Sequence, residues 1–335
     1  MNSMADLSHL LPPASLSDLA RAWLREDSPA FDYGGLVVGE RDERAVLLCK
    51  TPGVLAGAPF FQAVFHELGC NVEWFYHDGD MLLRHAGEAP CRVAVVTGKA
   101  RHLLLAERPA LNCLARASGV ATAARRACET ARAAGWAGQV AGTRKTTPGF
   151  RLVEKHALLV GGAATHRYDL SSMIMLKDNH VWSSGGITQA VRDAKRVGGF
   201  SLKVEVECRT LEEGREAARA GADVIMLDNV APPMLHTHAQ TLKSEFPGVV
   251  VEASGGVTDE NLLRYLGPSV DIVSLGSLTQ GYPVVDFSLK VSRETGVLGE
   301  NAVRGAATYS AGNGGSPSPP SSSATTPSAR RNYAF

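Results

Sequence analysis

Residues 202–229, with the sequence LKVEVECRTLEEGREAARAGADVIMLDN, predict a strand, a helix and a second strand in direct succession. Residues 202–207 alternate apolar and charged side chains, which is typical of a strand with one apolar face. Residues 211–220 have the pattern of an amphipathic helix, and residues 224–227 form a short apolar run. This succession is typical of two parallel strands joined by a crossover helix.

The same alternation continues on both sides of this stretch. Further strands are predicted at residues 139–144, 173–176, 249–253 and 272–275, and further helices at residues 187–197, 233–246 and 259–266. Repeated strand and helix units form either a doubly wound sheet or a β/α barrel. We favour the barrel, because groups that bind or react follow all six strands, whereas a doubly wound sheet binds its ligand at one switch point.

The residues before these repeats predict a smaller α+β layer. Strands are expected at residues 44–50, 72–76 and 91–97, and helices at residues 15–25 and 59–68. A long helical region follows over residues 101–135, and we expect interruptions near Pro109 and Gly119, because neither residue type favours a helix interior. Residues 310–328 contain only Ser, Pro, Gly, Ala, Thr and one Asn, so we expect a disordered tail after about Gly299.

Composition limits the classes of function. The chain has 34 basic and 34 acidic side chains, and its zero net charge argues against nucleic acid or an anionic membrane as a partner. The six cysteines are scattered without a CxxC pair, so we expect reduced thiols rather than a zinc cage or a disulfide framework. Neither a signal peptide nor a bilayer-spanning stretch is evident, and we therefore expect a cytoplasmic protein.

Cationic residues gather where the predicted strands end. In a β/α barrel the carboxyl ends of all strands open onto one rim, so residues that are distant in sequence converge there. The cationic candidates are Arg144, Lys145, His166, Arg167 and Lys177, with Arg108 from the preceding helical region as a sixth. So many cations on one rim, in a chain without net charge, predict a polyanionic ligand.

Two carboxylates, Glu207 and Asp228, follow adjacent predicted strands. Beside the cations they are candidate ligands for a Mg²⁺ ion that also contacts substrate phosphates. Other readings stay open, because Glu207 shares a strand face with Lys203 and Glu205, which could together fill the lumen as a salt-bridge network. Asp228 could instead cap the helix that follows it.

Glycine-rich loops follow the last two predicted strands. They contain Ser254, Gly255 and Gly256 in one case and Gly276 in the other. Glycine lets backbone N–H groups approach an anion, and these two loops are the usual phosphate seat of a β/α barrel. A Ser-Gly-Gly triplet alone is also common in ordinary turns.

Six short runs together resemble quinolinate phosphoribosyltransferase. They are GTRKTTPG at 142–149, HR at 166–167, KDNH at 177–180, KVEVE at 203–207, LDN at 227–229 and EASGG at 252–256. With the predicted elements, the resemblance implies an N-terminal α+β sandwich domain at residues 1–112 and an incomplete, TIM-like β/α barrel at residues 113–284. A segment at residues 285–298 would pack back on the first domain, before the tail at residues 299–335.

The resemblance also implies an activity and an assembly. The phosphoribosyl group of phosphoribosyl pyrophosphate (PRPP) would be transferred to quinolinate, which loses CO₂ to give nicotinate mononucleotide in NAD biosynthesis. Mg²⁺ is the implied cofactor, with PRPP as co-substrate and without an organic cofactor. The implied assembly is a homodimer with shared active sites, or a hexamer built from three such dimers.

Roles are carried over by motif. Lys145, Lys177, Glu207 and Asp228 would be catalytic, and the last two would also hold Mg²⁺. The implied substrate-binding residues are Arg108, Arg144, Lys145, His166, Arg167, Lys177, Glu207, Asp228, Ser254, Gly255, Gly256 and Gly276. Arg108 would reach in from the neighbouring subunit, although Pro109 predicts that a helix starts here and so changes the aim of that arginine.

Two other functions stay open at this point. Lys145, Lys177 or Lys203 could form a Schiff base, as in a barrel aldolase or decarboxylase. Such an enzyme needs one desolvated lysine, whereas the neighbouring arginines and carboxylates here indicate an anion and metal site. The barrel could also bind a metabolite without catalysis.

Overall fold

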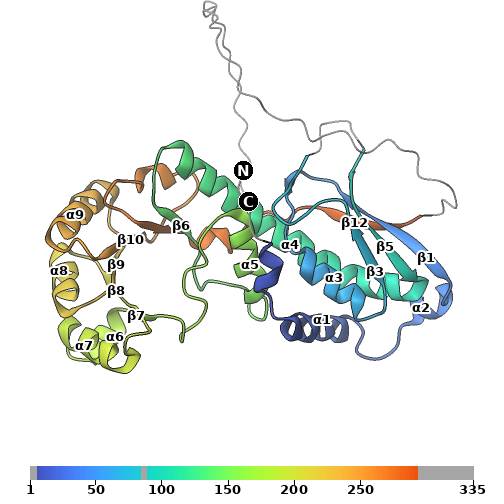
Figure 1. Ribbon diagram of the computed structural model, residues 1–335, viewed down its shortest axis with the longest axis horizontal. Coiled ribbons are helices and arrows are strands. Elements are labelled where there is room, and N and C mark those ends of the chain that lie inside the picture. Colours follow the sequence, from blue (N-terminus) through green and yellow to red (C-terminus); the bar gives the residue numbers. More distant parts are fainter. Residues whose placement is uncertain (1–5, 84–88, 293–335) are drawn as a thin grey trace, which may run out of the picture. The chain divides into compact units, whose positions relative to one another are not determined.

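The computed structural model describes residues 6–83 and 89–292 (Figure 1). The predicted tail at residues 299–335 lies outside the described residues, as does the end of the predicted segment 285–298. No helix within the described ranges combines the length and the apolar composition needed to cross a membrane.

An antiparallel sheet of four strands forms the N-terminal part, in the order β12-β1-β5-β3. Its strands are β1 (Asp42–Cys49), β3 (Asn71–Trp74), β5 (Cys91–Lys99) and β12 (Phe287–Val291). β12 comes from the segment after the barrel and pairs with β1, so that Leu289 lies opposite Leu47. The other elements are η1 (Leu7–Leu10), α1 (Pro13–Asp27), α2 (Tyr33–Val38), β2 (Gly53–Val54), α3 (Ala58–His66) and β4 (Met81–Leu82). Phe61 and Phe65 of α3 are fully buried in the core of this part.

Helix α4 (Ala100–Ala133) runs without a break through both predicted interruptions, so that prediction was wrong. Pro109 removes one hydrogen bond and costs about 3 kcal/mol in a helix interior. Leu103 and Leu114 on the same helix are fully buried, and each contributes about 1.5–3 kcal/mol, so packing outweighs the proline. At Gly119 a Cβ would lie 2.5 Å from the carbonyl oxygen of Pro283, so glycine permits a close contact here.

Six parallel strands form an incomplete barrel, in the order β6-β11-β10-β9-β8-β7. They are β6 (Gln139–Ala141), β7 (Ile174–Leu176), β8 (Val204–Cys208), β9 (Val224–Asp228), β10 (Val250–Ser254) and β11 (Ile272–Ser274). A single bridge from Ala141 to Ala164 extends the β6 edge, and no described strand joins that edge to β7. The predicted fold, an incomplete β/α barrel after an α+β domain, is confirmed.

Helices and short helical turns connect the barrel strands. They are α5 (Arg151–Gly161), α6 (Asp178–Ser183), α7 (Ile187–Gly198), α8 (Leu211–Ala220), α9 (Pro232–Glu245), η2 (Leu262–Arg264) and η3 (Gly276–Leu278). The predicted helix at residues 259–266 was wrong, because only η2 forms there. The side chain of Asn261 bonds Thr258 N at 2.7 Å and Gly256 O at 2.9 Å, which closes a local turn in place of a helix.

Strand register determines which side chains face the lumen. Glu207 lies opposite Met226, Met226 lies opposite Glu252, and Asp228 lies opposite Ser254. Alternate residues of a strand share a face, so Glu205 faces the same side as Glu207. The intervening apolar residues, such as Val206, Leu227 and Ala253, pack with the surrounding helices in the core.

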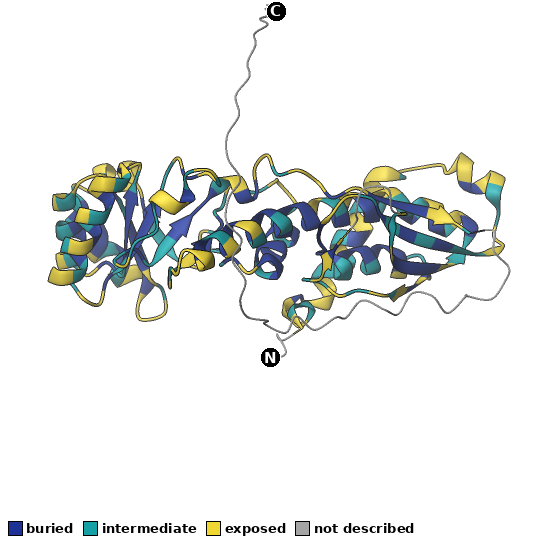
Figure 2. Ribbon diagram, turned by 90° about the horizontal axis from the view of Figure 1, so that it is seen from above, coloured by how far each residue is buried: buried dark blue, intermediate teal, exposed yellow. Residues whose placement is uncertain are grey.

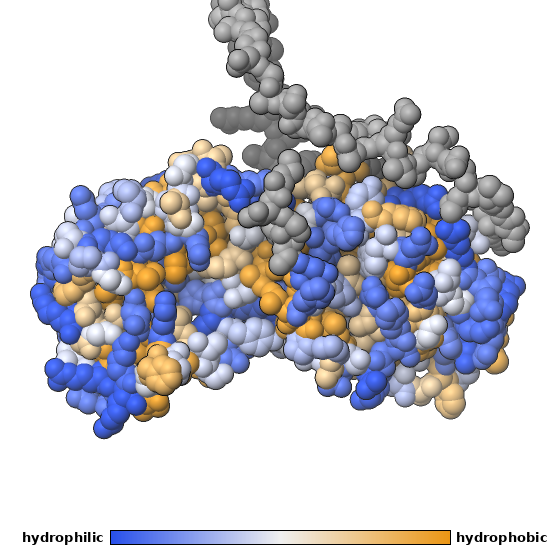
Figure 3. All heavy atoms as spheres, viewed as in Figure 1, coloured by the Kyte–Doolittle hydropathy of each residue, from blue (hydrophilic) through white to orange (hydrophobic). Residues whose placement is uncertain are grey.

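Lys203 does not join this inner face. It lies before β8 and is exposed, whereas Glu205 is fully buried. The structure therefore does not support the alternative reading, a salt-bridge network between Lys203 and Glu205. Figure 2 shows the buried residues along the strands and the exposed ones on the outer turns, and hydrophilic residues predominate over α7 and α8 on the face drawn in Figure 3.

Candidate active site

Lys177 and Glu207 form an ion pair between the ends of β7 and β8, in which Lys177 Nζ donates to Glu207 Oε2. The Glu207 side chain is 10% exposed and the Lys177 side chain is 47% exposed. A cavity of about 740 Å³ lies beside Glu207 and is also lined by Asp178, Trp182 and Arg209. A Schiff-base lysine must lose its charge, so an ion-paired Lys177 disfavours the aldolase alternative.

The loop after β6 carries two cations, Arg144 and Lys145. The Nε of Arg144 is buried and has no hydrogen-bond acceptor among the described residues. An unpaired buried donor is costly, so this guanidinium is set to receive an anion. Lys145 lies beside Gly276, and its carbonyl oxygen accepts a hydrogen bond of 2.8 Å from Thr279 Oγ1. A second cavity, of about 430 Å³, is lined by Lys145, Thr279 and neighbouring residues.

Asp228 is held at the end of β9 by its neighbours. Asn229 has a φ of 55°, its Nδ2 donates to Asp228 Oδ2 at 2.7 Å, and its backbone N donates to Ser254 O at 2.9 Å. Gly255 has a φ of 91°, and a Cβ there would lie 2.4 Å from Asn229 Oδ1. Only glycine fits that position without moving the asparagine. The Asp228 carboxylate and the Ser254–Gly256 loop thus lie side by side on the rim.

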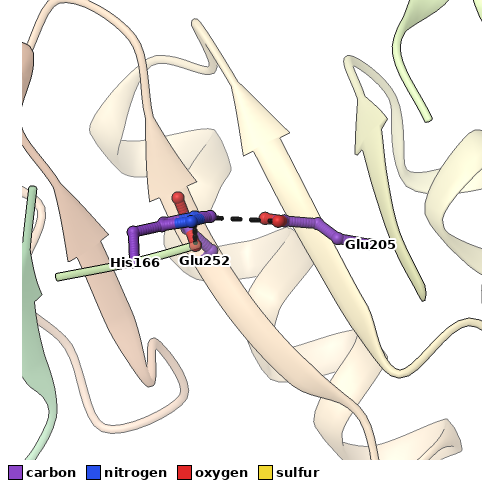
Figure 4. Close-up of side chains that lie close together, drawn as sticks. All are labelled: His166, Glu205 and Glu252. Carbon is purple, nitrogen blue, oxygen red and sulfur yellow. Dashed lines mark hydrogen bonds and ion pairs between the residues drawn. The ribbon is translucent and has the colours of Figure 1, made fainter. Parts of the chain in front are cut away.

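The His166 side chain, which is 8% exposed, lies between two carboxylates, those of Glu252 and Glu205 (Figure 4). Its Nε2 lies 3.1 Å from Glu252 Oε2 and 3.7 Å from Glu205 Oε2. Its Nδ1 accepts a hydrogen bond of 2.7 Å from the backbone N of Arg167. Because Nδ1 is an acceptor, the proton of the neutral ring lies on Nε2, and no nitrogen lone pair points at the carboxylates to bind a metal ion. Both ring nitrogens are used within the protein.

The two carboxylates of this cluster are too close to carry two charges. Burial, and after it the neighbouring Glu252 carboxylate, raise the pKa of Glu205 to about 9. Ser274 Oγ donates to Glu252 Oε1 at 2.6 Å, whereas neither oxygen of Glu205 has a hydrogen-bond donor among the described residues. We infer that Glu205 is neutral at physiological pH.

Arg167 lies beside this cluster and near Arg144. Burial and the charge of Arg144 lower the pKa of Arg167, while Glu205 opposes that shift. Among the described residues, the two terminal nitrogens of Arg167 donate only to Met173 O, at 3.5 Å, and to Met175 Sδ, at 3.4 Å. Arg144 and Arg167 are therefore two neighbouring guanidinium groups that form no ion pair with a described carboxylate.

Arg108 lies elsewhere in the chain, on the exposed side of α4. No hydrogen bond or ion pair joins it to another residue of the described part of the chain. The expected start of a helix at Pro109 was wrong, because α4 begins nine residues earlier, at Ala100. The structure thus brings Arg144, Lys145, Arg167, Lys177, Glu207, Asp228, Ser254 and Gly276 to one rim, and does not connect Arg108 to them.

Sequence reasoning missed two buried charged residues near the site, Glu252 and Lys155. Glu252 could have been found, because it lies two residues before Ser254 and so shares its face of β10. Lys155 lies inside an amphipathic helix, where the hydrophobic pattern alone did not single it out.

Comparisons with known proteins identify the family. Residues 33–118 match the family model described as quinolinate phosphoribosyl transferase, N-terminal domain, and residues 120–290 match the C-terminal domain of that family. The chain belongs to the quinolinate phosphoribosyltransferase family. The division between the two family domains, near residue 119, falls within helix α4.

Several members of the quinolinate phosphoribosyltransferase family are similar along nearly their whole length. Nicotinate-nucleotide pyrophosphorylase (carboxylating) of Homo sapiens is 56% identical over 285 residues, which cover 85% of this chain and 94% of the human protein. The protein of the same name from Dictyostelium discoideum is 48% identical over 299 residues, covering 86% of this chain and 100% of the relative. The solved nicotinate-nucleotide pyrophosphorylase of Francisella tularensis has a TM-score of 0.77 at 29% identity, covering 87% of this chain and 100% of that one.

Proposed function

We propose that the rim described above transfers the phosphoribosyl group of PRPP to the ring nitrogen of quinolinate, releasing pyrophosphate and CO₂ and forming nicotinate mononucleotide. The family match and the names of the relatives confirm the predicted enzyme class and its reaction, quinolinate phosphoribosyl transfer with decarboxylation. The observation that best supports the assignment to this rim is the Arg144 guanidinium, which lies near Arg167 and whose buried Nε has no acceptor within the described part of the chain.

We assign the cations to the anionic groups of the two substrates. Quinolinate carries two carboxylates and PRPP carries a phosphate and a pyrophosphate, so Arg144, Lys145, Arg167 and Lys177 all have anionic partners. His166 contributes indirectly, because its imidazole is bonded to Glu252 and to the backbone of Arg167. The glycine loops at Ser254–Gly256 and Gly276 offer backbone N–H groups to phosphate.

The donor set at Glu207 and Asp228 fits Mg²⁺. Both are carboxylates, they lie on neighbouring strands with their side chains on the same face, and the proposed phosphate loops lie beside them. When bound there with PRPP, Mg²⁺ would neutralise negative charge on the departing pyrophosphate. Lys177 Nζ donates to the same Glu207 carboxylate, and as a rim cation it would also contact a substrate anion bound beside that carboxylate.

The cationic rim favours both parts of the reaction. As the bond from ribosyl C1 to pyrophosphate breaks, C1 gains positive character and the quinolinate nitrogen forms a new bond to it. The basic side chains stabilise the departing pyrophosphate, which is electrostatic preorganisation without a covalent enzyme intermediate. The bond from ring C2 to its carboxylate then breaks, CO₂ leaves, and the electron pair stays on C2, stabilised by the positive ring nitrogen. Protonation of C2 completes the product.

We also propose the assembly that the family implies, a homodimer in which Arg108 of the partner subunit completes each site. Its exposed position on α4, without a hydrogen-bond or ion-pair partner among residues 6–83 and 89–292, supports that role. The dimer would then act as a soluble cytoplasmic enzyme on small-molecule substrates, without nucleic acid or membrane as a partner.

The direct test of this function is product analysis. Purified protein, quinolinate, PRPP and Mg²⁺ should give nicotinate mononucleotide by mass spectrometry, with no product when nicotinate replaces quinolinate. The aldolase alternative predicts instead that borohydride traps a carbonyl compound on a rim lysine, and a trapped adduct would overturn the assignment.

A further inference from the structure

Lys155 is a lysine of α5 whose side chain is turned into the protein, and it is 2% exposed. Its Nζ donates to two backbone carbonyl oxygens, that of Thr165 and, at 3.2 Å, that of Arg167. No described carboxylate forms an ion pair with it. The neighbouring Glu154 instead accepts hydrogen bonds from the backbone N and the hydroxyl of Thr147, at 2.9 and 2.8 Å.

The two carbonyl groups bonded by Lys155 lie on either side of His166. That residue has a φ of 57°, in the left-handed region that non-glycine residues rarely adopt. The loop is fixed from the other side by the bond of His166 Nε2 to Glu252 and by the bond of Arg167 N to His166 Nδ1. The backbone from Thr165 to Arg167 is therefore clamped by one ammonium and one imidazole.

The charge on Lys155 is placed in an unfavourable field. Burial and, after it, the charges of Arg151, Arg144 and Arg167 lower its pKa to about 8. A position with only a packing role would be more stable with an apolar side chain, because a buried cation among cations costs free energy. An anion bound at Arg144 and Arg167 would offset that repulsion, which links the lysine to the ligand site.

We propose that Lys155 is a positioning residue: by binding the carbonyl oxygens on both sides of His166, its ammonium sets the direction in which Arg167 presents its guanidinium to a substrate anion. This inference rests on the proposed function, because it needs an anion at Arg167. It assigns a role in ligand affinity to a side chain that does not reach the rim itself.

A double-mutant cycle tests the proposal. Quinolinate and PRPP are titrated separately by calorimetry into the wild type, Lys155→Met, Arg167→Ala and the double variant. Lys155→Met should weaken, by about tenfold or more, the same ligand that Arg167→Ala weakens. In the Arg167→Ala background the same change should weaken it less than about twofold, because the guanidinium that the lysine positions is gone.

Lys243→Met is the matched control. Lys243 is partly buried and likewise bonds a carbonyl oxygen, Val249 O at 3.0 Å, although it also pairs with Asp271 at 2.9 Å. It lies where β10 and β11 begin, at the other end of the barrel. The Lys243→Met change should lower the melting temperature and leave the dissociation constants of quinolinate and PRPP unchanged. If Lys155→Met does not fold by circular dichroism, Lys155→Leu, which also lacks an N–H donor, replaces it in the cycle.

The outcomes separate the inference from the function. An unchanged dissociation constant in folded Lys155→Met, or an equal loss in both Arg167 backgrounds, overturns the positioning role. Wild-type protein that neither binds nor converts quinolinate overturns the proposed function instead. Loss in kcat with normal affinity would also contradict the proposal, since positioning of Arg167 acts through binding.

Discussion

Gly276 lies so close to Lys145 that a Cβ on the glycine would meet Lys145 Cδ at 3.2 Å and Nζ at 3.6 Å. The contact joins the loop after β11 to the loop after β6, which are paired neighbours in the barrel. It places a lysine ammonium beside the backbone of the loop that we assign to phosphate. Glycine at 276 thus permits the lysine to lie over the loop.

This contact predicts the effect of Gly276→Ala. The φ at Gly276 is accessible to any residue, and the crowded atoms belong to two flexible side chains, Lys145 and Gln280, so the variant should fold. Lys145 must move by a few tenths of an ångström, and we expect the Michaelis constant for PRPP to rise by about three- to tenfold. Gly248→Ala, at an open position with nothing within 4 Å of the added Cβ, is the control and should be neutral. An unchanged Michaelis constant for PRPP in Gly276→Ala would show that Lys145 does not bind a phosphate of PRPP.

The orphaned Nε of Arg144 predicts that Arg144→Ala weakens substrate binding by more than about tenfold, which is about 1.4 kcal/mol. Lys177→Ala should do the same, because it removes a second rim cation. Arg196→Ala changes a 79% exposed side chain of α7 and serves as the control in the same steady-state assay. Michaelis constants near those of the wild type would remove the tested residue from the site.

The raised pKa of Glu205 predicts a pH-dependent stability. The folded chain keeps this proton up to about pH 9, whereas the unfolded chain releases it near the ordinary value of 4.5. The stabilisation is therefore complete below about pH 4.5 and is lost as pH rises through about 9. The side chain introduced by Glu205→Gln cannot ionise, so this variant does not lose stability in that way. The melting temperature of Glu205→Gln minus that of the wild type should therefore increase by about 2 °C or more from pH 5 to pH 8.5.

These melts are best made without substrates or Mg²⁺. Glu129→Gln, an exposed change on α4, controls for the general effect of removing a carboxylate. A constant difference between Glu205→Gln and the wild type across this pH range would show that Glu205 is ionised throughout.

Sharing of the site between subunits predicts complementation. Arg108→Ala and Glu207→Ala chains should each be inactive alone. In a mixed dimer one site would combine an intact Arg108 with an intact Glu207, so random exchange should restore about a quarter of the wild-type activity. No recovery, after subunit exchange is verified by a mass tag, would mean that Arg108 does not serve the neighbouring site.

The sequence predicted the barrel and its rim better than it predicted where individual helices begin and end. Residues at strand ends, such as Lys177 and Asp228, were found because every parallel strand ends on the same rim, whatever its exact length. The continuity of α4 through Pro109 was not predictable, because it depends on burial of leucines against elements that are distant in sequence. The helix expected at residues 259–266 failed because the side chain of Asn261 competes for backbone groups.

Part of the candidate site was also hidden from the sequence. The ion pair of Lys177 with Glu207 follows from strand order, which pairs β7 with β8. The contact of His166 with substrate stays a prediction; in the structure its ring is bonded to Glu252 and to the backbone of its own loop, which the sequence did not reveal. Lys155 became visible only when the carbonyl groups that it bonds were placed in space.

The most direct test of the central claim is release of labelled CO₂ from carboxyl-labelled quinolinate. PRPP and Mg²⁺ are each supplied or omitted, and Asp228→Asn and Arg144→Ala are run beside the wild type. We predict release only when both PRPP and Mg²⁺ are present, with large losses in both variants. Release without PRPP, or release that neither variant diminishes, would contradict the claim that this rim couples phosphoribosyl transfer to decarboxylation.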